Sequence, residues 1–250
     1  MEQLRAWAVT HPGTIRSHNE DACVSRPDLG LWVVADGAGG HDVGEMASGL
    51  IATALDSIPP ELSPEETLTQ VRMRMAAVHA ALRERAARQG YGVIASTVVV
   101  LIVRRGHFAC LWAGDSRAYL LRDGALVRIT RDHSLVQDLV DGGQITEAEA
   151  ENHPRANIVT RAVGVEDVVE LDKVTGRLVA GDQFLLCSDG LCKELSDPEM
   201  LDILRADGPE LAAERLVEAA LARKARDNVT AVVLEVPSLQ GTDVTPEGAR

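Results

Sequence analysis

Short apolar runs rich in β-branched residues recur along the chain, and they constrain its fold more than any other feature. Seven runs are typical of buried strands, and they cover residues 31–35, 97–103, 108–113, 118–121, 126–129, 184–187 and 229–236. The pair Asp123-Gly124 predicts a tight hairpin, because it supplies the positive φ angles of a primed turn. Helical patterns come in blocks rather than after every strand. They cover about 44–57, 64–89, 134–141, 198–205 and 209–222. This order favours an α+β fold with antiparallel pairing over a doubly wound parallel sheet.

Composition and charge narrow the class of protein further. Of the 250 residues, 46% are hydrophobic and 25% are charged, which is ordinary for a globular domain. No Pro-, Gly- or Ser-rich linker divides the chain, so we expect a single domain over residues 1–236 and a disordered tail over 237–250. The formal net charge of −13 repels phosphate backbones and anionic lipids, so neither nucleic acid nor a membrane is an expected partner.

Cysteine usage and hydropathy predict a cytoplasmic protein. The four cysteines form no CxxC pair and lack the histidine spacing of a zinc site, so we expect reduced thiols. The N-terminus lacks the layout of a signal peptide. The longest apolar run, 97–103, is far shorter than the roughly 20 residues of a membrane span. We also expect a monomer.

Carboxylates stand at one end of several of these strands, each beside a small residue. They are Asp36 after 31–35, Asp115 after 108–113, Asp189 after 184–188 and Asp227 before 229–236. The pair Glu20-Asp21 is a fifth acidic site. Aspartate and glycine are common in turns, so turn formation alone explains any one of these positions. It explains the set less well, because the strands of one sheet bring their ends together and such carboxylates would converge.

A converging set of carboxylates requires cations. At an effective dielectric of about 20, two unit charges about 4 Å apart repel by about 4 kcal/mol. All the candidate ligands are oxygens, which favours Mg²⁺ or Mn²⁺ over zinc. A pair of such ions acidifies water and holds an in-line displacement at phosphorus, so the pattern predicts phosphoester hydrolysis. Arg16 is a candidate to bind phosphate oxygens, and a surface salt bridge is an equally good interpretation of it.

Seven motifs in sequence order resemble those of the metal-dependent PP2C-type (PPM) protein phosphatases in their bacterial form. They are RSHNED at 16–21, ADGAGGH at 35–41, GEMAS at 44–48, GDSRAY at 114–119, TRDHS at 130–134, SDGL at 188–191 and DNVT at 227–230. The resemblance implies an antiparallel β-sandwich flanked by helix pairs, in α-β-β-α layers, with metals at one edge. It also implies hydrolysis of phosphoserine and phosphothreonine in proteins by a metal-activated water.

The resemblance implies a role for each acidic site. Asp36 would bridge two central Mn²⁺ or Mg²⁺ ions, and the carbonyl of Gly37 would bind one of them. Asp115 together with Asp189 would hold a third ion. The remaining ligands would be Asp227, which with Asp189 completes the other central ion, and Glu20 and Asp21, acting directly or through water.

The resemblance leaves the proton donor open. Arg16 would bind the substrate phosphate. In eukaryotic members a histidine directly follows the Asp-Gly pair, but here that position is Ala38. The nearest histidine, His41, is a candidate general acid, and a loop residue without a catalytic role is the alternative. Ser188 and Cys187 have no histidine placed by motif to activate them, so we expect neither to be a nucleophile.

Residues 134–164 resemble the flap of bacterial members. Gly142-Gly143 and Pro154 bracket a short amphipathic stretch, which favours a mobile lid over a packed helical insertion. The resemblance also implies phosphorylated protein substrates and an opposing Ser/Thr kinase, and some relatives accompany kinases of secretion machinery. Two alternatives are a phosphatase of small phosphorylated metabolites and a catalytically inactive binding module. Loss of a metal aspartate would mark the inactive module, and every such position is filled here.

Overall fold

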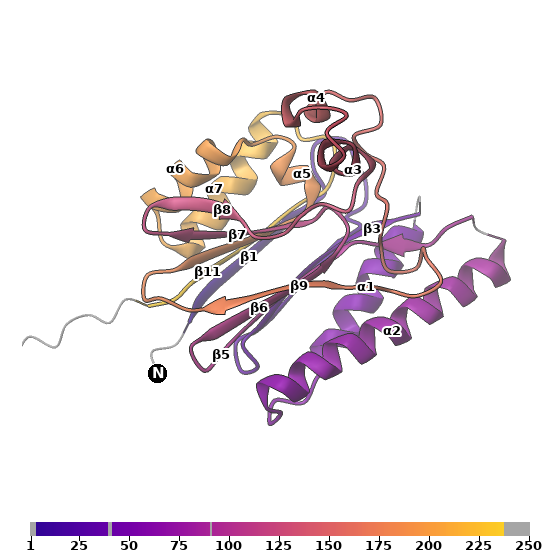
Figure 1. Ribbon diagram of the computed structural model, residues 1–250, viewed down its shortest axis with the longest axis horizontal. Coiled ribbons are helices and arrows are strands. Elements are labelled where there is room, and N and C mark those ends of the chain that lie inside the picture. Colours follow the sequence, from indigo (N-terminus) through magenta and orange to yellow (C-terminus); the bar gives the residue numbers. More distant parts are fainter. Residues whose placement is uncertain (1–3, 40–41, 91, 238–250) are drawn as a thin grey trace, which may run out of the picture.

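The computed structural model describes residues 4–39, 42–90 and 92–237, in which two β-sheets pack face to face between two layers of helices (Figure 1). Sheet A has the strand order β1 (Arg5–His11), β11 (Val229–Glu235), β10 (Gln183–Cys187), β7 (Arg117–Arg122) and β8 (Ala125–Arg128). Sheet B has the order β2 (Asp21–Arg26), β3 (Leu31–Ala38), β5 (Val98–Arg104), β6 (His107–Ala113) and β9 (Asp172–Arg177), and the short β4 (Ala95–Ser96) pairs with β3. Neighbouring strands are antiparallel. The predicted α+β sandwich is confirmed.

Strand β5 shows why the sequence contains such long apolar runs. Its side chains alternate between the two faces of sheet B. Val99, Leu101 and Val103 pack between the sheets, whereas Val98, Val100 and Ile102 pack toward the helices. A strand that is buried on both faces has no polar side, so the alternation of apolar and polar residues disappears.

Helix pairs cover both outer faces of the sandwich (Figure 1). Sheet B is covered by α1 (Asp42–Asp56) and α2 (Pro64–Gln89), and sheet A by α6 (Asp197–Ala206) and α7 (Pro209–Ala222). Helix α2 begins at a capping box formed by Ser63 and Glu66 and ends at Gly90, whose φ of 68° suits a left-handed cap. Within the three described ranges, none of the helices combines the length and apolar character that crossing a bilayer requires.

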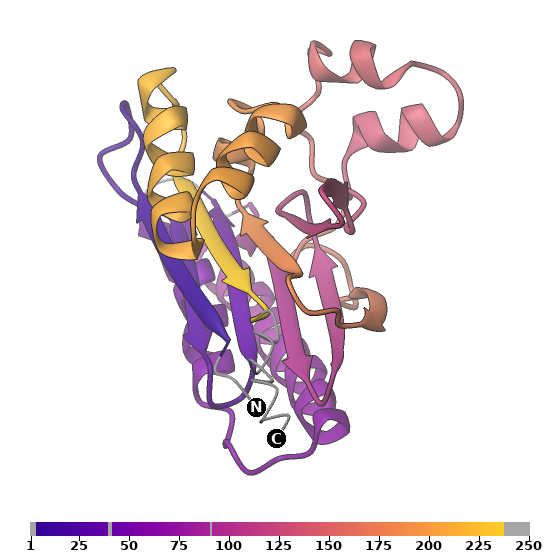
Figure 2. The same ribbon diagram turned by 90° about the vertical axis from the view of Figure 1, so that its left-hand side faces the viewer.

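The predicted flap contains α3 (Leu135–Asp141) and α4 (Glu147–Glu151) and stands out from one end of the sandwich (Figure 2). Its two ends are joined by backbone hydrogen bonds. Leu135 N–H donates to the carbonyl of Ile158 at 2.9 Å, and Thr160 N–H donates to that of His133 at 2.8 Å. The mobility of the flap stays a prediction.

Candidate metal centre

Asp21 and Asp36 mark the place where the two sheets meet. They lie opposite each other on β2 and β3 of sheet B. Oδ2 of Asp21 accepts hydrogen bonds from the hydroxyls of Ser188, which follows β10, and Thr230, on β11, at 2.7 and 2.6 Å. Thr230 lies in sheet A, and Ser188 directly follows a strand of that sheet. Asp21 is therefore fixed across the sandwich, and its other oxygen, Oδ1, is buried without a hydrogen-bond partner among the described residues.

Asp36 lies at the centre of an acidic cluster. Burial raises its pKa well above the usual range, and the carboxylates of Asp21, Asp189, Asp115 and Asp227 raise it further. Burial, with smaller contributions from neighbouring carboxylates, likewise raises the pKa of Asp21 and of Asp115 to about 7. The structure thus brings the five aspartates from separate strand ends into one region, where their negative charges repel one another.

Close backbone contacts fix the turn after Asp36 against the first turn of α1. Gly37 N–H donates to the carbonyl of Glu20 at 3.1 Å, and a Cβ added to Gly37 would lie 2.0 Å from the carbonyl oxygen of Gly44. A Cβ added to Gly44 would lie 2.7 Å from the carboxyl carbon of Glu20. Gly37 therefore requires glycine, because the clash is with backbone, whereas a side chain at Gly44 would displace the carboxylate of Glu20. The carboxylate of Glu20 lies against the N-terminal turn of α1, where the helix dipole favours negative charge.

Asp115 lies in the turn between β6 and β7. Gly114, with φ of +117°, has no room for a side chain, because an added Cβ would lie 2.5 Å from Cβ of Thr97. Thr97 also connects this turn to Asp36. Its hydroxyl lies 2.7 Å from that of Ser116 and accepts a hydrogen bond from Asp36 N–H at 3.2 Å. The sequence motifs gave no signal for Thr97, whose role depends on contacts between strands.

Asn228 fixes the loop that carries Glu20. Its amide oxygen accepts from Glu20 N–H at 2.8 Å, and its amide nitrogen donates to the carbonyls of Pro12 and His18 at 3.0 Å. Gly190, next to Asp189, packs against the carbonyl of Asn228, from which an added Cβ would be 2.1 Å away. Asn228 belongs to the DNVT motif, which marked this position in the sequence. From the sequence, a role was assigned only to Asp227 of that motif, and it was not predicted that Asn228 holds the loop of Glu20.

Two cationic side chains form ion pairs with members of the cluster. Nη2 of Arg16 lies 3.2 Å from Oδ1 of Asp227, and both side chains are about half exposed. Nζ of Lys193 forms an ion pair with Oδ2 of Asp189. Burial works against the charge of Lys193, but Asp189 and then Asp115 outweigh it and the pKa of Lys193 is raised. Asp21, Asp36 and Asp115 form no ion pair with any residue described in the structure.

The donor set fits divalent metal ions. It consists of oxygens, the preferred ligands of Mg²⁺ and Mn²⁺, and the buried oxygens Oδ1 of Asp21 and Oδ1 of Asp189 have no protein partner among the described residues. In this arrangement, no three acidic, histidine or cysteine side chains of the described residues are close enough to enclose an ion. The ligand roles of Glu20, Asp21, Asp36, Gly37, Asp115, Asp189 and Asp227 stay predictions. The candidate general acid His41 lies outside the described residues.

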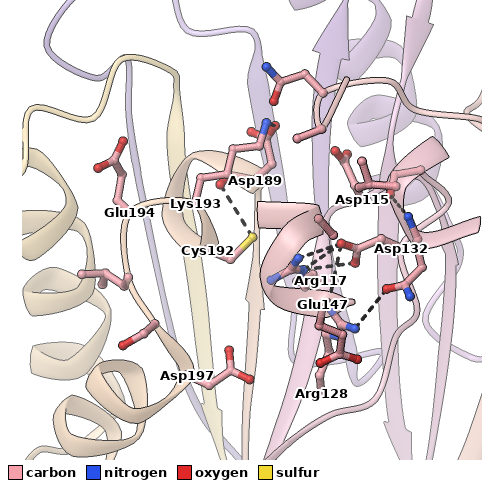
Figure 3. A pocket seen from close by; sticks show the side chains of 18 of the residues that line it. Asp115, Arg117, Arg128, Asp132, Glu147, Asp189, Cys192, Lys193, Glu194 and Asp197 are labelled. Carbon is pink, nitrogen blue, oxygen red and sulfur yellow. Dashed lines mark hydrogen bonds and ion pairs between the residues drawn. The ribbon is translucent and has the colours of Figure 1, made fainter. Parts of the chain in front are cut away.

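A cavity of about 880 Å³ opens beside the cluster, between the flap and the helices α5 (Asp189–Cys192) and α6 (Figure 3). Asp115 and Asp189 line it together with charged residues of both signs. Arg117 and Asp132 form a two-pronged ion pair there, with nitrogen–oxygen distances of 2.7–3.1 Å. The cavity therefore connects the acidic cluster to a polar surface.

Comparison with known proteins identifies the family. The chain matches the model of the protein phosphatase 2C family over residues 15–224. The chain therefore belongs to this family.

Two named relatives are bacterial phosphatases. Over 237 residues, this chain is 37% identical to the serine/threonine protein phosphatase PstP of Mycobacterium tuberculosis. The match covers 93% of this chain but 45% of PstP, so this chain spans about half the length of that relative. Over 235 residues, this chain is 34% identical to the serine/threonine phosphatase stp of Listeria monocytogenes, and the match covers 90% of this chain and 93% of that protein.

Two solved structures share the fold closely. One is PppA, described as a key regulatory component of T6SS in Pseudomonas aeruginosa, with a TM-score of 0.87, 43% identity and coverage of 94% of this chain and 98% of that one. The other is the catalytic domain of PstP in complex with two manganese ions, with a TM-score of 0.85, 35% identity and coverage of 94% and 99%. The fold and the family implied by the sequence motifs are thus confirmed.

Proposed function

We propose that this chain hydrolyses phosphoserine and phosphothreonine in proteins, using water activated by Mn²⁺ or Mg²⁺. The observation that supports this most directly is the buried carboxylate of Asp36, which lies opposite Asp21 and whose pKa is raised by burial and by the charges of four other aspartates, while Asp21 and Asp36 form no ion pair with a described residue. Such a concentration of negative charge persists only when cations compensate it. Family membership then favours phosphoester hydrolysis over the other uses of such a cluster.

In this proposal Asp36, Asp189, Asp227 and the carbonyl of Gly37 would hold two central ions, with Asp36 shared between them. Glu20 and Asp21 complete the set directly or through water. Oδ2 of Asp21 is already occupied by two hydroxyl donors, so Oδ1 is the oxygen left for this role. Asp115 with Asp189 would hold a third ion. When bound, the ions lower the pKa of a water molecule and neutralise the charge that develops on the phosphoryl group.

Arg16 binds the substrate phosphate. Its pair with Asp227 is solvent-exposed, and such pairs contribute only about 0–1 kcal/mol, so the guanidinium turns toward a phosphate at little cost. Its planar fork of N–H groups matches two phosphate oxygens. The leaving oxygen is protonated by His41 or by water, and these two donors remain alternatives.

The same proposal covers the cellular compartment, the oligomeric state and the protein substrates of the chain. The chain acts in the cytoplasm as a monomer and a single domain over residues 1–236, with a mobile flap at about 134–164. Its substrates are proteins phosphorylated by an opposing Ser/Thr kinase. The relative PppA is described as a regulator of T6SS, so signalling to a secretion system is a candidate pathway.

Phosphorylated metabolites are the alternative substrates, because the cavity volume of about 880 Å³ falls in the range of small-molecule pockets, about 300–1,000 Å³. Such pockets are mostly apolar, whereas this one is lined mainly by charged and polar side chains, which favours an extended polar substrate. We expect turnover of a phosphothreonine peptide to exceed that of every compound in a panel of phosphorylated metabolites. A metabolite with the higher kcat/KM would reverse the choice of substrate.

Replacing Arg16 should separate substrate binding from chemistry. In Arg16→Ala, we expect KM for a phosphopeptide to rise by roughly tenfold or more, because a charge-assisted hydrogen bond contributes about 1.5–3 kcal/mol. Hydrolysis of a small aryl phosphate should suffer less. Steady-state kinetics on both substrates, with Arg85→Ala as an exposed-arginine control on α2, measures this. Equal losses on both substrates would mean that Arg16 does not have the assigned role.

A further inference from the structure

Lys193 is placed beside the acidic cluster by the local structure of α5. Its backbone N–H donates to the carbonyl of Asp189 at 2.9 Å and closes the last turn of this short helix. The two side chains are four residues apart, the spacing at which an acidic residue followed by lysine pairs well on a helix. Nζ of Lys193 accordingly forms an ion pair with Oδ2 of Asp189. The side chain of Asp189 is 14% exposed and that of Lys193 41%, so the pair lies at the mouth of the cluster.

The same ammonium faces the cavity that Asp115 lines from the other side. Figure 3 shows Asp189 and Lys193 together on one wall and Asp115 across from them. The positive charge of Lys193 stabilises the ionised form of Asp115, against the effects of burial and of Asp189. One tethered cation thus acts on both carboxylates that the proposed third ion would use.

The carboxylates at the centre of the cluster have no such cation beside them among the described residues. Asp21 and Asp36 form no ion pair with a described residue, and the pair of Arg16 with Asp227 does not involve them. Two of the proposed central ligands, Asp21 and Asp36, are therefore uncompensated, whereas both proposed ligands of the third ion, Asp115 and Asp189, lie under the charge of Lys193.

We propose that Lys193 is a built-in counter-cation of Asp115 and Asp189 and competes with a metal ion for that side of the cluster. This inference rests on the proposed function, because it takes the two carboxylates as metal ligands. It assigns the lysine a positioning and competing role and no contact with the reacting atoms. The third ion binds only when the ammonium turns away, so its affinity is set by a residue outside the acidic motifs.

The test uses the full chain, freed of metal and titrated with Mn²⁺ in a calorimeter. In Lys193→Gln, we expect the weakest Mn²⁺ site to tighten by about tenfold or more, which corresponds to about 1.4 kcal/mol. Lys193→Arg keeps the charge and should titrate like the wild type. Lys173→Gln removes the same charge from an exposed position on β9 and is the matched control. Identical isotherms for Lys193→Gln and the wild type would overturn the proposal.

Asp115→Ala locates the effect. The double variant Asp115→Ala/Lys193→Gln should lose the gain in affinity, because the site that Lys193 contests is then incomplete. A gain that persists in the double variant would place Lys193 at the central ions and refute the assignment.

A second measurement needs no metal. In chelator, Lys193→Gln should melt at a lower temperature than the wild type and Lys173→Gln should not, because the carboxylates lose their counter-ion. An unchanged melting temperature would contradict the counter-cation role. If the wild type binds no Mn²⁺ at all, the proposed metal site fails, and the melting result still decides the role of Lys193.

Discussion

Asp36→Asn is expected to abolish phosphatase activity while leaving the protein folded. Removing one preorganised electrostatic group from an active site costs about 10²–10³-fold in kcat, and Asp36 would bridge both central ions, so we expect a loss greater than about 10³-fold. The amide has nearly the shape of the carboxylate, so packing should not change. Turnover of a phosphothreonine peptide at saturating Mn²⁺ measures the loss.

The stability of the same variant provides an internal control. Burial and four neighbouring carboxylates oppose the charge of Asp36, and the neutral amide removes that repulsion. In chelator, the melting temperature of Asp36→Asn should therefore equal or exceed that of the wild type. Asp123→Asn removes a carboxylate from the β7–β8 hairpin, away from the cluster. We expect this control to have the activity of the wild type and the same melting temperature in chelator. Substantial activity in the folded Asp36→Asn variant would remove Asp36 from the proposed mechanism.

Chelation should reduce turnover to the level of the uncatalysed reaction, and Mn²⁺ should restore it. Phosphate-monoester hydrolysis is so slow without a catalyst, with accelerations up to about 10²¹-fold, that no background should be detectable. Mg²⁺ should restore activity less well and Ca²⁺ not at all, because Ca²⁺ binds oxygens at about 2.3–2.6 Å rather than about 2.0–2.1 Å. Full activity in a preparation shown by mass spectrometry to be metal-free would refute the proposed metal dependence.

The strands that the sequence predicted are those buried on both faces or joined by a recognisable turn. Strand β8 was found because Asp123 and Gly124 have positive φ angles of 51° and 76° and form the expected hairpin. Strands β1, β2 and β9 were missed, as was the two-residue β4 beside β3. The first three lie at the edges of their sheets and have a partly exposed side, so their sequences contain at most a short apolar stretch, the longest being residues 6–9 in β1. Edge strands depend on a partner that local hydropathy does not reveal.

Local sequence signals also marked the aspartates that are candidates for the site. Asp36, Asp115 and Asp189 each follow a buried strand, and this local signal suffices to mark them as candidates. Their meeting point depends on which strands pair and on how the two sheets stack. Thr97 and Asn228 hold the site through contacts with residues 61 and 208 positions away, at Asp36 and Glu20, and nothing near them in sequence indicates those partners.

The sequence by itself determined the fold class and the family and marked the acidic candidates for the site, because periodic burial, turn residues and acidic motifs are local properties. Only the tertiary structure decided how the charge of the site is distributed. The hydroxyls that occupy one oxygen of Asp21 come from the segments of the other sheet. Lys193 reaches Asp189 along one helical turn, but its action on Asp115 needs the β6–β7 turn and α5 to face each other across the cavity. Electrostatic interaction depends on distance in space, and that distance is set by the packing of the sandwich.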